Sequence, residues 1–505
     1  MADCDKLYNL GDFLAHYAKQ IPNKTAIIFN DQNLSYAEIN RAANQLAHVL
    51  LALDVKKGDH IFLFSYRSPE LIIAFLAALK IGAVAVPGNY ELPPQQLRQL
   101  ILSLQAKLLL CSEKLQPVIA ALQNKNLNCP TLLLKELGSQ AWLKDGELTT
   151  GISSLNPKVT STPDDIAYLN YTSGSTGKPK GAITTHANII ANTKSAINAL
   201  ELGRDDIHLC MFAPFAHPHE LLARPLYLGG TMVLLDHIRP KSIARALTKH
   251  QVTAFMGLAP LFETLLEINR SRTFNLDALK LPESGGMYTN SGLIRRFLKT
   301  FGVPIVPVWG STETTGIAIA NRPGKEPVNG SVGQPCPGYK VEIIDQQNHP
   351  VKIGETGELI FQGEGVVAGY YESQKKPNRA FHNEWYYSGD LARQDEKGNI
   401  YFIARRAGML KVAGLAVFPQ EIEMVLQEHP DILEVAVIGT QDRLRGEIPV
   451  VHMVLRPGTK LKKENLLAWC REDLASYKLP RKIVYQNELP KTSNGKIDRQ
   501  ALMAE

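Results

Sequence analysis

The sequence predicts an α/β protein with a large N-terminal domain of layered α/β subdomains and a small α+β C-terminal domain. Three observations lead to this expectation. The chain has 505 residues, more than a single hydrophobic core usually serves. Helical periodicity alternates with short β-rich runs up to Lys340, as in mostly parallel sheets covered by helices. Beyond Lys340, short runs are separated by Gly, Pro, Asn and Asp, as in small antiparallel sheets.

The expected elements follow in chain order. The N-terminal part should contain helices over Ser35–Leu53, Pro69–Leu79 and Leu293–Thr300, and strands over Ile61–Phe64, Ala83–Val86 and Thr231–Leu235. A small β-barrel-like subdomain should use strands over Val341–Ile344, Gly357–Gln362 and Ile400–Ile403. Helices over Pro419–Glu428 and Lys463–Ala475 should then flank strands over Glu434–Ile438 and Val450–Leu455. We predict a boundary near 404–408, which gives an N-terminal domain 1–404 and a C-terminal domain 405–505.

Composition and charge exclude several classes of function. Lys plus Arg total 55 against 49 for Asp plus Glu, and this mild excess is spread along the chain. No helix-turn-helix or zinc-finger spacing is present, so we do not expect nucleic-acid binding. The six cysteines are scattered, and the N-terminus lacks a secretion signal, which predicts a cytoplasmic protein. The most apolar stretch, 71–86, is interrupted by Lys80 and Gly82, so no membrane span is expected.

The most informative segment is the Ser/Thr/Gly-rich run 171–181, which follows a strand-like run at 166–169. Backbone amides and small hydroxyl side chains can close round phosphate oxygens, and two lysines supply compensating charge. The run is not a Walker A loop, because that pattern requires Gly at Thr172 and a hydroxyl residue at Pro179. It is interpreted as a phosphate-binding loop, with a plain flexible turn as the alternative.

This loop resembles the signature of the adenylate-forming superfamily, which includes acyl-CoA synthetases, peptide-synthetase adenylation domains and firefly-type luciferases. The resemblance extends over nearly the whole chain. Further matching segments occur in the family's order: Ser284-Gly285-Gly286, Trp309-Gly310-Ser311-Thr312-Glu313, Gly357-Glu358-Leu359, Tyr387-Ser388-Gly389-Asp390, Ala404-Arg405 and Pro490-Lys491-Thr492-Ser493-Asn494-Gly495-Lys496. Several independent matches in one order make chance an inadequate explanation.

The resemblance implies catalytic roles for individual residues. Lys496 matches a lysine that swings into the active site and bridges the attacking carboxylate and the α-phosphate. Glu313 would bind Mg²⁺ together with Thr172. Asp390 would accept the ribose hydroxyls, and Arg405 would add a cation near the nucleotide. The remaining nucleotide or coenzyme A contacts would come from Ser173, Gly174, Ser175, Thr176, Gly177, Lys178, Gly285, Gly286, Trp309, Gly310, Ser311, Thr312, Lys411 and Gly414.

The acyl site is expected around His217, in a segment that resembles the family's acyl-pocket wall. Relatives that activate α-amino acids usually place Asp there, so the resemblance favours an acid without an α-amino group. A metal cluster of His217, His219 and Glu220 is the alternative for these residues. The bulky Met287 and Tyr288 follow Gly286 where the family commonly has Ala-Pro, and Trp309 replaces a frequent Tyr. These side chains are expected to narrow the pocket in favour of small or aromatic acids.

One departure from the family pattern lies at the expected hinge. The family usually has Gly-Arg-x-Asp there, and this chain has Ala404-Arg405-Arg406-Ala407, so Ala407 replaces the hinge Asp. Ala still reaches both main backbone basins, and Gly408 adds freedom, so rotation of the C-terminal domain is not prevented. The segment 408–414 still resembles the loop that enters the site for the second step.

The leading hypothesis is an acid:CoA ligase that uses ATP, Mg²⁺ and coenzyme A and releases AMP and pyrophosphate. A second hypothesis is an enzyme that loads the pantetheine of a separate carrier protein. A third, from another class, is a catalytically silent nucleotide- or acyl-binding protein. A luciferase-like oxygenase also remains open, because oxidation of an acyl-adenylate requires no separate motif. The sequence does not identify the acid or the oligomeric state.

Overall fold

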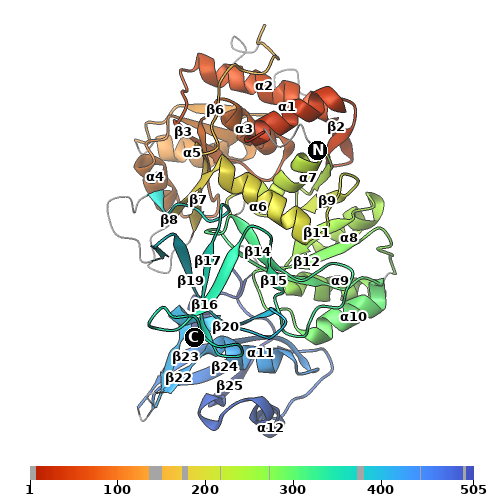
Figure 1. Cartoon of the computed structure of the whole chain (residues 1–505), viewed down its shortest axis with the longest axis vertical. Coiled ribbons are helices and arrows are strands. Elements are labelled where there is room, and N and C mark those ends of the chain that lie inside the picture. Colours follow the sequence, from red (N-terminus) through yellow and green to blue (C-terminus); the bar gives the residue numbers. More distant parts are fainter. Residues whose placement is uncertain are drawn as a thin grey trace.

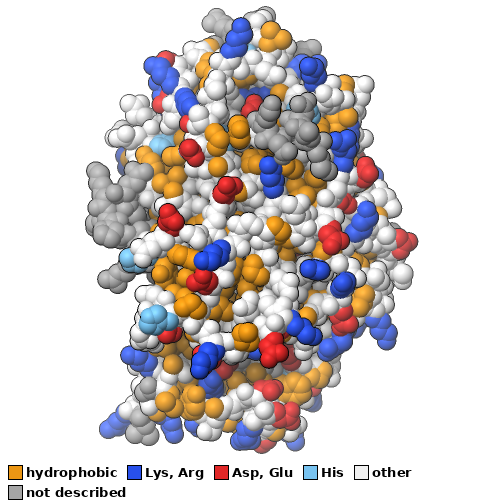
Figure 2. Space-filling view, viewed as in Figure 1, with side chains coloured by type: hydrophobic (Ala, Val, Ile, Leu, Met, Phe, Trp, Pro, Cys, Tyr) orange, Lys and Arg blue, Asp and Glu red, His pale blue; other side chains and the backbone are white. Residues whose placement is uncertain are grey.

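The computed structural model describes residues 7–124, 126–135, 151–172, 180–216, 218–271, 273–371, 380–413, 415–443, 445–492 and 496–504. Figure 1 shows two regions stacked along the longest axis. The larger region holds the N-terminal sheets and their helices, and the smaller one holds the last strands and α12. On the face drawn in Figure 2, acidic and basic side chains are interspersed with apolar ones.

Two largely parallel sheets form the frame of the larger region. One has the strand order β6-β5-β3-β4-β7-β8, and the other has β15-β14-β13-β12-β11-β9-β10-β1-β2. Their parallel strands are short and apolar, as expected for strands covered on both faces. The bounds are β1 Thr25–Phe29, β2 Gln32–Ser35, β3 His60–Phe64, β4 Val84–Pro87, β5 Leu108–Ser112, β6 Thr131–Leu134, β7 Ile166–Thr172, β8 Lys180–Thr185, β9 Ile207–Cys210, β10 Thr231–Leu234, β11 Ala254–Gly257, β12 Leu281–Ser284, β13 Val306–Ser311, β14 Gly316–Ala320 and β15 Gln334–Pro335.

Helices cover both sheets and divide the apolar core into layers. The central layer joins side chains of both sheets with α1, α2, α3 and α7, whereas α8, α9 and α10 pack on the outer face of the longer sheet. The other sheet is covered on its outer face by α4 and α5. The bounds are α1 Leu10–Gln20, α2 Tyr36–Ala52, α3 Pro69–Lys80, α4 Pro94–Ser103, α5 Gln116–Gln123, α6 His186–Ala199, α7 Ala223–Leu228, α8 Pro240–Lys249, α9 Ala259–Ser271 and α10 Ser291–Phe301.

Local sequence explains where the main predicted helices begin. Ser35 caps α2 in a capping box with Glu38. The Ser35 hydroxyl accepts from the Glu38 amide, and the Glu38 carboxylate accepts from the Ser35 amide. Ser68 caps α3, Pro69 occupies its first turn, and every residue of this helix is buried. The expected helices at Ser35–Leu53 and Pro69–Leu79 are therefore confirmed to within one or two residues.

The change in sequence pattern at Lys340 coincides with the start of a separate antiparallel sheet. Its strand order is β16-β17-β19-β18, and β20 also pairs with β19. The bounds are β16 Lys340–Ile344, β17 Gly357–Gln362, β18 Phe381–His382, β19 Trp385–Gln394 and β20 Ile400–Arg405. Strand β19 carries Asp390 opposite Arg405 on β20, so this register brings two candidate site residues together.

The C-terminal residues build a sheet of their own, with the order β22-β21-β24-β23 and β25 beside β24. The bounds are β21 Leu410–Val412, β22 Leu415–Val417, α11 Pro419–Gln427, β23 Ile432–Asp442, β24 Gly446–Leu455, α12 Lys463–Asp473, β25 Lys482–Tyr485 and α13 Arg499–Ala504. The turn Arg406–Gly408 separates the last strand of the preceding sheet from the first strand of this one. The predicted boundary near 404–408 spans the end of β20 and this turn, and it stays a prediction.

Two sequence expectations concern cysteines and membranes. The five cysteines among the described residues are buried and form no disulfide: Cys111, Cys129, Cys210, Cys336 and Cys470. Within the same described ranges, every helix is too short or too polar to cross a bilayer.

Candidate active site

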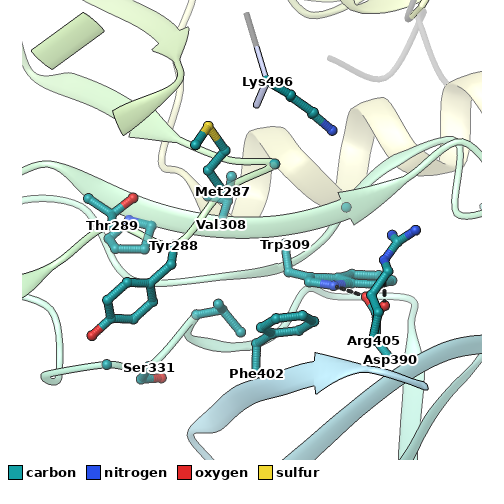
Figure 3. Close-up of a pocket in the computed structure, with 15 residues that line it drawn as sticks. Met287, Tyr288, Thr289, Val308, Trp309, Ser331, Asp390, Phe402, Arg405 and Lys496 are labelled. Atoms are coloured by element: carbon teal, nitrogen blue, oxygen red, sulfur yellow. Dashed lines mark hydrogen bonds and ion pairs between the residues drawn. The ribbon is translucent and has the colours of Figure 1, made fainter. Parts of the chain in front are cut away.

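A cavity of about 160 Å³ opens where the N-terminal and C-terminal regions meet. Its walls are the loop after β12, strand β13, residues 330–332, the paired strands β19 and β20, and Lys496 (Figure 3). Six of the site residues named from the sequence line it: Gly286, Trp309, Gly310, Asp390, Arg405 and Lys496. The full set of lining residues is Gly286, Met287, Tyr288, Thr289, Pro307, Val308, Trp309, Gly310, Gly330, Ser331, Val332, Asp390, Phe402, Arg405 and Lys496.

Trp309, Asp390 and Arg405 form one connected group on the floor of this cavity. Trp309 stacks on Phe361 with ring centroids 4.4 Å apart, and its Nε1 donates to Asp390 Oδ2 over 2.9 Å. Arg405 Nε lies 2.9 Å from Asp390 Oδ1. Asp390 is only 1% exposed, and burial raises the pKa of its carboxyl while Arg405 opposes that shift. The carboxylate is thus held in one orientation by two neighbours.

Lys496 enters the cavity from the opposite side (Figure 3). A methyl group placed on Gly286 would lie 3.6 Å from Lys496 Nζ. Desolvation by the surrounding protein, together with the nearby Arg405 guanidinium, lowers the pKa of Lys496. Thr492 N donates to Lys496 O over 2.7 Å, which ties the backbone of the lysine to the residue four positions before it. The candidate catalytic cation therefore faces the same space as Asp390 and Arg405.

Two glycines shape the cavity wall by close approach. Gly286 has φ +74°, a left-handed conformation that side-chain-bearing residues rarely adopt. At Gly310, an added Cβ would lie 2.5 Å from Gly316 O on the paired strand β14. Gly285, Ser311 and Thr312 adjoin these positions in the chain but are not among the lining residues that the structure describes.

Glu313 belongs to a neighbouring group beside strand β8, where Tyr370 bridges Ala182. Tyr370 Oη donates to Glu313 Oε1 over 2.5 Å, and Val367 N donates to Glu313 O over 2.9 Å. Burial and the Glu313 carboxylate raise the pKa of Tyr370, so its hydroxyl stays a donor. One carboxylate oxygen of Glu313 is thus fixed by the tyrosine, and a hard oxygen of this kind suits Mg²⁺. Thr172 ends β7, whose partner β8 begins at Lys180.

Several predicted site residues lie outside the described residues: 173–178 of the phosphate loop, His217 and Gly414. Lys411 lies on β21 with an exposed side chain and does not line the cavity that contains Lys496. Among the described residues, the structure therefore brings part of the predicted nucleotide group together and leaves Lys411 away from that cavity.

The residues after position 217 belong to the protein interior. His219 Nδ1 lies 2.7 Å from Tyr168 Oη, and Arg224 makes a bidentate pair with Glu283 at 2.8 and 2.9 Å. Glu220 is 3.7 Å from Arg224, and burial raises the pKa of Glu220 to about 7. Among the described residues, no group of three His, Cys, Asp or Glu side chains could hold a metal ion. His219 and Glu220 thus have protein partners.

The chain matches models of known protein families. Residues 14–371 match the family model described as AMP-binding enzyme, and residues 421–496 match its AMP-binding enzyme C-terminal domain. This chain belongs to the AMP-binding enzyme family. The first match alone spans well over half of the sequence, and both regions described above are included.

Individual relatives of this AMP-binding enzyme cover almost its whole length. Indoleacetate–CoA ligase from Aromatoleum aromaticum is 30% identical over 97% of this chain and 96% of its own. Crotonobetaine/carnitine–CoA ligase from Salmonella paratyphi B is 29% identical over 95% and 96%. The crystal structure of the anthranilate CoA ligase AuaEII with anthranoyl-AMP aligns with a TM-score of 0.89 at 28% identity, covering 99% of this chain and 98% of that one.

The structure adds residues that the sequence reasoning missed or interpreted differently. Tyr288, which is expected to narrow an acyl pocket, lines the cavity, and its hydroxyl points away from Lys496 and donates to Glu428 at the C-terminal cap of α11 (Figure 3). Phe402 lines the cavity although only its strand was predicted. Tyr370 orients Glu313, and the local sequence Gly369-Tyr370 does not indicate this role. These contacts join segments far apart in the chain, so no local pattern announces them.

Proposed function

We propose that this AMP-binding enzyme joins a carboxylic acid to AMP and then transfers the acyl group to the thiol of coenzyme A. In the first step a carboxylate oxygen attacks the α-phosphorus of ATP, and pyrophosphate leaves. In the second step the CoA sulfur forms the thioester, and AMP leaves. The observation that supports this most strongly is the convergence of Lys496, Asp390, Arg405 and Trp309 on one cavity.

The chemistry of the lining residues fits an adenine nucleotide. A buried aromatic side chain beside a glycine loop offers a flat apolar wall for a base. The Asp390 carboxylate keeps unused lone pairs after its contacts with Trp309 and Arg405, so it can accept from ribose hydroxyls. Lys496 then offsets the negative charge that accumulates between the attacking carboxylate and the α-phosphate.

Magnesium has a suitable ligand in Glu313, whose second oxygen is not used by Tyr370. When bound, the ion would offset phosphate charge as pyrophosphate leaves. We place Thr172 and the loop 173–178 on the phosphate side, because β7 ends at Thr172. This assignment follows the match between the loop and the family signature.

The second step requires a different arrangement of the C-terminal domain. We place the division at 404/405, because the sheet changes between β20 and β21. Lys411 and Gly414 lie just beyond this turn, on the segment that we propose turns toward the site for thioester formation. Ala407 lies in the turn itself, and Arg406 pairs with Glu358 at 2.7 Å.

For the acid we propose a compact or ring-bearing carboxylate without an α-amino group. Indoleacetate–CoA ligase and anthranilate CoA ligase are relatives named for aromatic acids, and another relative is named for carnitine. The position of His217 carries no carboxylate that could hold an α-ammonium group.

A panel of acids tests the proposal. Indole-3-acetate, anthranilate, benzoate, carnitine, phenylalanine and palmitate are each incubated with ATP and Mg²⁺, with and without CoA. AMP and acyl-CoA are measured by mass spectrometry. We expect CoA-dependent formation of AMP and thioester with at least one compact acid. Acyl-AMP that accumulates without thioester would favour a carrier-protein acceptor, and nucleotide binding without turnover would favour the non-catalytic alternative.

A further inference from the structure

Glu428 connects the C-terminal region to the wall of the nucleotide cavity. It caps the C-terminal end of α11, and its carboxylate reaches across to the loop before α10. Tyr288 Oη donates to Glu428 Oε1 over 2.8 Å, Ser291 N donates to the same oxygen over 3.1 Å, and Ser291 Oγ donates to Oε2 over 2.7 Å. Both carboxylate oxygens are therefore engaged by the N-terminal region.

Helix electrostatics favour Glu428 only while the two regions are docked. Ser291 is the first residue of α10, and its amide is one of those that a helix cannot satisfy internally; Asn290 caps the amide of Leu293. A carboxylate at this positive end is stabilised, whereas the same carboxylate lies at the negative end of its own helix, α11. Undocking would leave Glu428 with the unfavourable helix end alone.

A second polar contact lies close to the first. Arg456 Nη2 and Nη1 lie 2.9 and 3.3 Å from the two oxygens of Glu263 on α9, and Arg296 of α10 also pairs with Glu263. Arg456 Nε donates to Pro430 O, two residues beyond Glu428. These contacts are ionic and hydrogen-bonded, a type that suits an interface within one chain that opens and closes.

The loop that receives Glu428 is also the loop that faces Lys496. Tyr288 follows Gly286 by two residues, and Lys496 Nζ lies over Gly286. We propose that Tyr288, Ser291 and Glu428 form a latch that holds the C-terminal domain in the arrangement in which Lys496 serves acyl-AMP formation. Tyr288 and Glu428 are thus positioning residues for Lys496, and release of the latch precedes thioester formation. This inference rests on the two-step function proposed above.

The tyrosine supplies a donor that a Pro or Ala at this position would lack. Burial and the adjacent Glu428 carboxylate raise the pKa of Tyr288 well above its usual range, so the hydroxyl stays protonated and keeps donating. The latch also gives a role to Tyr288, which stands where the family commonly has Pro. The hinge of the same chain carries Ala407 in place of the family's Asp. The docked state then depends on contacts at the interface and less on the hinge side chain.

The test compares Glu428→Gln and Tyr288→Phe with the matched control Glu421→Gln. Glu421 lies on the same helix but pairs with Lys478 inside the C-terminal region, at 2.5 Å. With indole-3-acetate as the probe acid, Glu428→Gln should slow exchange of labelled pyrophosphate into ATP about 10-fold. Thioester formation from supplied indoleacetyl-AMP should be unchanged or faster. Glu421→Gln should leave both rates within two-fold of wild type.

A distance measurement tests the latch without any acid. Spin labels at Lys325→Cys and Lys462→Cys, in a Cys4→Ser background, report the separation of the two regions with ATP and Mg²⁺ present. We expect a single main distance in the latched protein and a second, well-populated distance after Glu428→Gln. An unchanged distance distribution, or equal loss of both half-reactions, would overturn the latch. Failure of the wild type to exchange pyrophosphate with every acid of the panel would instead count against the proposed function, and the distances would still decide the latch.

Discussion

The two sides of the nucleotide cavity are held in different ways. On one side Asp390 is 1% exposed, and Trp309 and Arg405 hold its carboxylate within paired strands of the N-terminal region. On the other side Lys496 belongs to the C-terminal region, and it reaches the cavity only because that region docks. One side forms when the core folds, and the other forms when two regions meet.

This difference suggests how one site can serve two reactions. Residues needed throughout, such as those for the nucleotide, belong to the rigid side, where burial and sheet pairing restrict their motion. The residue needed for one step belongs to the docked side, where polar contacts of Glu428 and Arg456 can be exchanged for water. Changes on the rigid side should therefore affect both half-reactions, and changes on the docked side only one.

Lys496→Ala should have the largest effect and should separate the half-reactions. Without the cation, acyl-AMP formation should fall by at least about 100-fold, because its developing charge loses a positioned partner. Thioester formation from supplied acyl-AMP should stay within a few-fold of wild type. Both rates are measured by single-turnover assays with separated products. Equal losses would show that the lysine serves both steps and would remove the contrast between the two sides.

Asp390→Asn should weaken nucleotide binding on the rigid side of the cavity and slow both half-reactions. Loss of a charged acceptor should raise the KM for ATP about 10- to 100-fold and weaken AMP binding to a similar degree. Asp395→Asn is the control, because Asp395 is half-buried in the turn after β19 and accepts hydrogen bonds from Asn399 and Tyr401. Titration calorimetry with AMP compares the two variants. Normal AMP affinity in Asp390→Asn would exclude the carboxylate from the ribose site.

Tyr370→Phe tests the magnesium side of the rigid half. Removing the hydroxyl that orients Glu313 should raise the Mg²⁺ concentration for half-maximal pyrophosphate exchange about 10-fold, as for other partners of metal ligands. Tyr371→Phe, one residue along, should change this concentration less than two-fold. If Tyr370→Phe leaves the Mg²⁺ dependence unchanged, Glu313 is not the ligand that Tyr370 positions.

Much of this architecture could be predicted from the sequence, because short-range patterns carry it. The capping serines at 35 and 68, the buried strands and the turn at 404–408 are local signals. Asp390, Arg405 and Lys496 were found through motifs matched to a family. The latch could not be found this way, since Tyr288 and Glu428 are 140 positions apart and each is an ordinary surface residue type alone.

Glu220→Gln should have the smallest effect on rate and a clear effect on stability. Burial raises the pKa of Glu220 to about 7 from 4.5, so the folded state holds its proton more tightly than the unfolded state does. This stabilisation is complete below about pH 4.5 and is lost as pH rises through 7, on the order of 3 kcal/mol in all. The wild type should therefore lose thermal stability relative to Glu220→Gln between pH 5 and pH 8. If the thermal unfolding midpoints of the wild type and Glu220→Gln differ by the same amount from pH 5 to pH 8, the pKa of Glu220 is not raised.

The central claim is that the docked arrangement is the one that forms acyl-AMP, with Lys496 beside the reacting phosphate. A crystal structure with ATP and Mg²⁺ tests it most directly. We expect the adenine base to stack against Trp309 and the ribose hydroxyls to donate to Asp390. Lys496 Nζ should lie about 3 Å from an α-phosphate oxygen. A nucleotide bound elsewhere, or a lysine that cannot reach the phosphate while Glu428 still holds Tyr288, would contradict it.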